Sequence, residues 1–144
     1  MLGRTEDALR AKRDVYFGRV KLHGRENGQT LTAASNYATT LIQTKKCKEA
    51  RSVLLKTMPV AQRVLGKTHE LTLKMRWAYA LALSADAGAT LDDLREAVKT
   101  LEETEKTIRQ VYGGAHPFTV RVDNALRVSR AALRARETPP PGGA

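Results

Sequence analysis

The sequence predicts an all-α protein of about six helices, stacked as antiparallel helix hairpins into a right-handed α-solenoid. Composition is the first observation, because alanine and leucine dominate and only 5% of the residues are aromatic, which favours helices over a β-sandwich. The second is a linker segment that occurs three times along the chain. The third is an apolar stripe with helical spacing before two of these linkers.

The recurring linkers set the length of the repeat. They occupy residues 23–31, 65–73 and 112–120, and each has a glycine at its second position and a threonine at its eighth. Their threonines, at positions 30, 72 and 119, are therefore 42 and then 47 residues apart. The five additional residues of the second unit fall around 87–90, where we expect a loop to absorb them.

Each expected helix has its own signal, and the six span residues 5–21, 31–44, 47–65, 71–86, 91–112 and 118–135. The second and fourth share a Tyr-Ala pair followed by a leucine. The third and fifth carry the apolar stripes, and Gly66 and Gly113 end them. Pro117 suits the first turn of the last helix, where its missing N–H is not needed. Pro59 lies inside the third helix and is expected to bend the axis while facing solvent.

The expected segments are an N-terminal tail, a half-repeat, two full repeats, a second half-repeat and a disordered Pro/Gly tail. In order, they span residues 1–4, 5–29, 30–71, 72–118, 119–136 and 137–144, so that the repeat domain covers 5–136. Small residues in the middle of the first helices and early in the second helices let neighbouring helices approach closely. These residues are Ala38, Ala50, Ala80 and Ala97.

Charge and cysteine content narrow the function classes. Lys and Arg number 25 against 15 Asp and Glu, and the net charge of +10 favours acidic partners. The single cysteine, Cys47, excludes a disulfide framework and is expected to be a small buried hydrophobe. No apolar run approaches the ~18 residues of a membrane span, so we expect a cytoplasmic protein without a membrane partner.

Catalytic patterns are missing from the sequence. It has no phosphate-binding glycine loop, no Ser–His–acid arrangement and no cluster of metal ligands, so we expect no enzyme activity and no cofactor. His69 and His116 recur at the same linker position. They are therefore expected to be residues of the turn that starts a helix and not metal ligands.

Four short stretches of the sequence lie in or near the linkers. They are Asn36-Tyr37-Ala38-Thr39-Thr40-Leu41, Lys46-Cys47-Lys48-Glu49-Ala50, Leu65-Gly66 with His69 and Thr72-Leu73, and Gly113 with His116-Pro117 and Thr119. Together they resemble the tetratricopeptide repeat, in the long variant found in kinesin light chains. The resemblance covers roughly residues 5–135. It implies a solenoid in which the first helix of each pair lines a concave groove that recognises short acidic peptides.

The resemblance also implies which residues line that groove. By position these are Thr32, Ser35, Asn36 and Thr39, then Lys74, Trp77 and Leu81, then Arg121, Asn124 and Val128. Asn36 and Asn124 would bond the peptide backbone, and two cations, Lys74 and Arg121, would meet its acidic side chains. Trp77 would be the apolar anchor. The alternative is that Trp77 fills the interface between the second and third of these helices, and that the two cations are ordinary solvated residues.

The sequence therefore favours a non-catalytic adaptor or scaffold that binds an acidic protein or peptide segment. The first alternative is binding of nucleic acid or another polyanion through the basic terminal helices, in which few aromatic residues are interleaved with the basic ones. The second is that the chain is part of a larger repeat array, or associates with itself through the apolar faces of its terminal helices.

Overall fold

The computed structural model describes residues 2–138, which form six helices and contain no strand. The helices are α1 (Leu2–His23), α2 (Gly28–Gln43), α3 (Cys47–Leu65), α4 (Glu70–Ala85), α5 (Leu91–Tyr112) and α6 (Pro117–Glu137). The predicted all-α class and the predicted number of helices are thus confirmed. The predicted tail from 139 onward lies outside the described residues.

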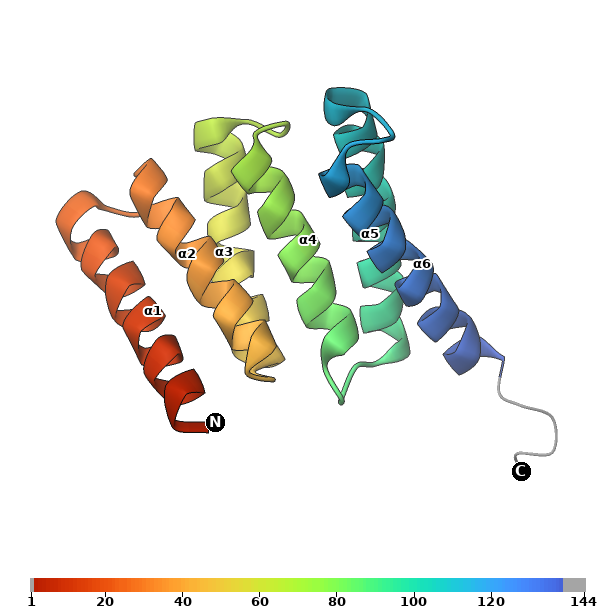
Figure 1. The fold of residues 1–144 in the computed structure, drawn as a ribbon, viewed down its shortest axis with the longest axis horizontal. Helices are drawn as coiled ribbons and strands as arrows, with labels where there is room; N and C mark the ends of the chain where they lie inside the picture. The colour runs from red at the N-terminus through yellow and green to blue at the C-terminus, as the bar shows by residue number, and fades with distance from the viewer. Residues whose placement is uncertain (1, 139–144) are drawn as a thin grey trace.

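The helices follow one another across the molecule in chain order, with α1 and α6 at opposite edges (Figure 1). Successive helices run in opposite directions, and each packs on the next one. In addition, α2 packs on α4, whereas α4 and α6 touch only lightly. The buried apolar residues form one continuous core from α1 to α6.

Three glycines end alternate helices in the same way. Gly24, Gly66 and Gly113 follow α1, α3 and α5, and their φ angles of +80°, +100° and +87° lie in a region that other residues rarely adopt. Each donates its N–H to the carbonyl four residues earlier, at 2.9, 3.0 and 2.9 Å. The predicted ends at Gly66 and Gly113 are confirmed, and Gly24 follows the same rule.

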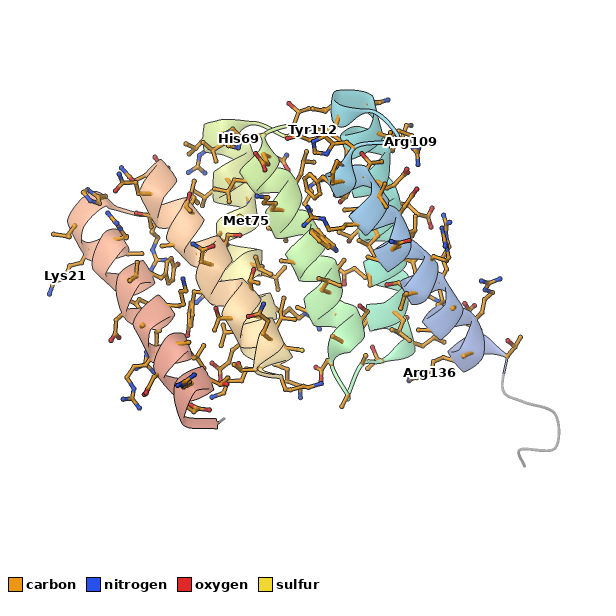
Figure 2. All side chains as sticks on the ribbon, viewed as in Figure 1. Lys21, His69, Met75, Arg109, Tyr112 and Arg136 are labelled. Atoms are coloured by element: carbon orange, nitrogen blue, oxygen red, sulfur yellow. The ribbon has the colours of Figure 1, made fainter. Side chains whose placement is uncertain are left out.

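The N-cap residues of α2, α4 and α6 also occupy equivalent positions of the repeat. Asn27, His69 and His116 are N-caps whose side chains accept the N–H two residues later, at 2.8, 3.1 and 3.1 Å. Their spacings are the 42 and 47 residues of the linkers. The prediction that both histidines belong to turns is therefore confirmed, and Figure 2 shows His69 where α3 passes into α4.

Replacing His69 with alanine is expected to lower the free energy of unfolding by about 0.5–2 kcal/mol, because one N-terminal N–H of α4 loses its acceptor. His69→Asn is expected to retain most of this stability, since asparagine caps α2 at the equivalent position. Urea unfolding followed by circular dichroism measures both. His23→Ala, at an exposed histidine, is the control. An asparagine variant as unstable as the alanine variant would contradict the capping role.

Equivalent positions of the two full repeats are buried alike. Leu54 and Leu101 are both fully buried, as are the four alanines predicted to allow close approach. The buried hydroxyls of Thr57 and Thr104 both donate to the carbonyl four residues earlier, at 2.9 and 2.6 Å. Cys47 is buried, as predicted, and burial raises the pKa of its thiol. The repeat found in the sequence is therefore a repeat of packing positions.

The hydroxyl of Tyr79 links α4 and α5, the two helices of the second full repeat, because it donates to the Glu96 carboxylate on α5 at 2.7 Å. Burial, followed by this hydrogen bond, raises the pKa of Tyr79 to about 12. Tyr37 is its equivalent on α2, and burial together with the negative charge of Glu49 on α3 raises the pKa of Tyr37 as well.

Some boundaries differ from prediction. Helix α1 begins at Leu2, so residues 2–4 are helical and not a tail, and α6 continues to Glu137. The five additional residues of the second unit are only partly absorbed by a loop. The α4–α5 connection, 86–90, is longer than its 44–46 counterpart, and the rest lengthen the start of α5. The cause is local, because Thr90 and Asp93 form a capping box, with bonds of 3.0 and 3.1 Å, that fixes this earlier start.

Candidate functional site

A groove of about 290 Å³ lies between α2 and α4. It is lined from α2 by Ser35, Asn36, Thr39, Ile42 and Gln43, and from α4 by Lys74, Trp77, Ala78 and Leu81. On each helix these positions recur at three, four and seven residues, so one face of each helix forms one wall. Because α2 and α4 occupy equivalent positions in the repeat, the two walls are also equivalent to each other.

Trp77 provides the largest apolar surface of the groove. It is partly buried, and its ring packs on Phe118 of α6 with centroids 5.9 Å apart and planes at 46°. The indole N–H is buried and has no acceptor among the described residues. Trp77 therefore packs in the contact between α4 and α6, and it also lines the groove between α2 and α4.

The polar groups of the α2 wall differ in what they can offer a ligand. Ser35 is buried, and the Thr39 hydroxyl is engaged by its own helix, because it donates to the Ser35 carbonyl at 3.0 Å. Asn36 is exposed, and its side-chain amide makes no hydrogen bond within residues 2–138. Its free donor and acceptor are suited to pair with the N–H and C=O of an extended peptide.

Lys74 provides the positive charge of the groove. Its Nζ lies 3.0 Å from a carboxylate oxygen of Glu70, one helical turn earlier, and both side chains are more than half exposed. The hydrogen bond from Lys74, and then its charge, lower the pKa of the Glu70 carboxyl. An acidic ligand would therefore compete with Glu70 for Lys74. The i,i+4 spacing of Glu70 and Lys74 is the sequence signal for this pair.

Six of the ten residues predicted to line the groove do line it, namely Ser35, Asn36, Thr39, Lys74, Trp77 and Leu81. Arg121 and Asn124 are exposed on α6 and lie outside the groove. Thr32 lines a different depression, between α1 and α2, and Val128 is exposed on α6. Sequence reasoning missed Ile42, Gln43 and Ala78. The first two lie one turn beyond Thr39 on the same helical face, and Ala78 follows Trp77 on α4.

Within 2–138 no group of three or more His, Cys, Asp or Glu side chains is placed to hold a metal ion. None of the six described helices is long and apolar enough to cross a membrane.

Fold and groove together define an all-α protein with a helical repeat and a small amphipathic groove between two equivalent helices. No protein-family model matches the chain, and no curated protein matches its sequence significantly. The resemblance to tetratricopeptide repeats accordingly stays a prediction.

Proposed function

We propose that this chain is a non-catalytic interaction module, an adaptor or scaffold that binds a short acidic peptide segment in the groove between α2 and α4. The proposed architecture is a right-handed, tetratricopeptide-like α-solenoid. The equivalent N-caps, the glycines that end alternate helices and the contacts limited to near neighbours in the chain support it.

The observation that carries the proposal is the convergence of Asn36, Lys74 and Trp77 on one groove. They supply an amide for the peptide backbone, a cation for an acidic side chain and an aromatic surface for an apolar one. The volume of about 290 Å³ is at the low end for ligand pockets, so it fits one or two side chains of an extended segment. The overall charge of +10 adds long-range attraction for an acidic partner.

A fluorescein-labelled peptide in which glutamates flank one leucine tests the proposal by fluorescence anisotropy. Trp77→Ala and Lys74→Ala are each expected to weaken binding about tenfold, because they remove the anchor and the cation. Arg121→Ala makes the same charge change outside the groove and is the matched control. Glu70→Gln is expected to strengthen binding about two- to fivefold, since it releases Lys74 from an exposed ion pair.

Three results would count against this groove. They are unchanged affinity in both the Trp77 and the Lys74 variants, an equal loss in the Arg121 control, and equal binding of a peptide with glutamine in place of glutamate. The last would show that acidic side chains are not recognised.

A further inference from the structure

A second and larger depression, of about 610 Å³, lies between α5 and α6. Apolar side chains in it are Val98 from α5 and Leu126 and Leu133 from α6. They are surrounded by Glu102 of α5 and four charged residues of α6, namely Asp123, Arg127, Arg130 and Arg134. We refer to this depression as the α5–α6 groove. It shares no residue with the groove between α2 and α4.

The α6 residues of this groove form one stripe along the helix. Positions 123, 126, 127, 130, 133 and 134 recur at three, four and seven residues, so they share a face about 16 Å long. Another helix of three turns lying along this stripe would match its length. The stripe therefore has the shape and periodicity of a helix-binding surface.

The charges of the α5–α6 groove are unevenly balanced. Asp123 is already paired with Arg109 of α5, at 2.9 Å. Glu102 lies 3.9 Å from Arg130, a long ion pair between half-exposed side chains. Arg127 and Arg134 are exposed and have no ion-pair partner within residues 2–138. The groove thus presents guanidinium groups whose charge is not neutralised by its own carboxylates.

The groove is also fixed in place. Arg136, near the end of α6, donates to the carbonyl of Ala89 in the α4–α5 loop at 3.1 Å, which ties the end of α6 to the body of the protein (Figure 2). Arg130 and Arg109 connect α6 to α5 further along the helix. A preformed surface of this kind loses little conformational entropy when a partner binds.

We propose that the α5–α6 groove docks an acidic amphipathic helix of a partner protein, with leucine-like side chains on Val98 and Leu133 and carboxylates on Arg127, Arg130 and Arg134. A guanidinium group can hold a carboxylate through two parallel hydrogen bonds, which gives this pairing direction as well as charge.

A second copy of the chain is a poor occupant, because the helices at both edges are basic. Helix α6 carries five arginines against two carboxylates, and α1 carries six Lys and Arg against three carboxylates. Nucleic acid is also disfavoured, because the groove contains no aromatic side chain on which a base could stack. A helix with carboxylates beside an apolar stripe matches both the charge and the apolar floor.

The test uses the full chain and a synthetic peptide of about 20 residues, with leucines at helical spacing and glutamates on both sides of them. In fluorescence anisotropy, the triple variant Arg127→Ala, Arg130→Ala, Arg134→Ala is expected to bind at least about tenfold more weakly. Leu133→Asn is expected to weaken binding as well, without changing charge. Amide shifts in NMR are expected to map to α5 and α6.

Matched controls separate this groove from general charge and from the proposed peptide groove. The triple variant Arg10→Ala, Lys12→Ala, Lys21→Ala removes the same charge from α1, at the opposite edge from Arg136 (Figure 2), and is expected to change affinity by less than about twofold. The Lys74→Ala, Trp77→Ala double variant, in which the α2–α4 groove is disabled, is expected to show the same dependence on the three arginines of α6 as the parent chain. Equal loss in both triple variants, no arginine dependence in that background, or binding of a DNA duplex but not of the peptide would each overturn the proposal.

Discussion

Replacing Leu54 with alanine is expected to lower the free energy of unfolding by about 2–5 kcal/mol, the range for a fully buried leucine. Leu54 on α3 has no exposed surface, and neither has Leu101, its equivalent on α5. The loss combines the transfer of the removed atoms to water with the cavity they leave. Because the two leucines occupy the same position of the repeat, Leu101→Ala is expected to fall in the same range. Urea unfolding followed by circular dichroism measures both.

Leu55→Ala is the matched control, because it makes the same change one residue further along α3 on a side chain that is 49% exposed. It is expected to change stability by no more than about 0.5–1 kcal/mol. If Leu54→Ala were no more damaging than Leu55→Ala, the apolar stripe of α3 would not be the face that packs in the core.

The linkers could be predicted because their chemistry is local. A glycine that ends a helix, a capping side chain three residues later and a threonine three residues after that act through backbone groups only a few residues away. Such signals do not depend on how the helices are arranged in space. The predicted start of α1 was wrong because Thr5, followed by Glu6 and Asp7, has the composition of a helix start, whereas the helix already begins at Leu2.

The groove could be predicted only in part, because its lateral extent depends on distances between helices. Repeat offsets place Trp77 and Phe118 between α4 and α6 at the positions that Ser35 and Leu71 occupy between α2 and α4. Two rings need more room than a serine and a leucine, which accounts for the close packing of α2 on α4 and the light contact of α4 with α6. Arg121 and Asn124 therefore do not line the groove, although they occupy the positions on α6 that Lys74 and Trp77 occupy on α4.

The ion pair of Lys74 and the basic stripe of α6 also differ in how far the sequence predicts them. The Glu70–Lys74 pair follows from spacing within one helix. That Asp123 is occupied by Arg109, while Arg127 and Arg134 stay unpaired, depends instead on which face of α6 meets α5. Helical periodicity defines faces, but packing decides which of them are covered.

Replacing Ala97 with leucine is expected to lower the free energy of unfolding by about 1–3 kcal/mol, because Ala97 is fully buried on α5, which packs on both α4 and α6. Leucine and alanine are both good helix formers, so the loss measures crowding between the helices and not helix propensity. Ala11→Leu, at an exposed position in the middle of α1, is the control and is expected to be nearly neutral. Thermal unfolding compares them, and an Ala97→Leu variant as stable as the parent would show that no neighbouring helix packs closely on this alanine.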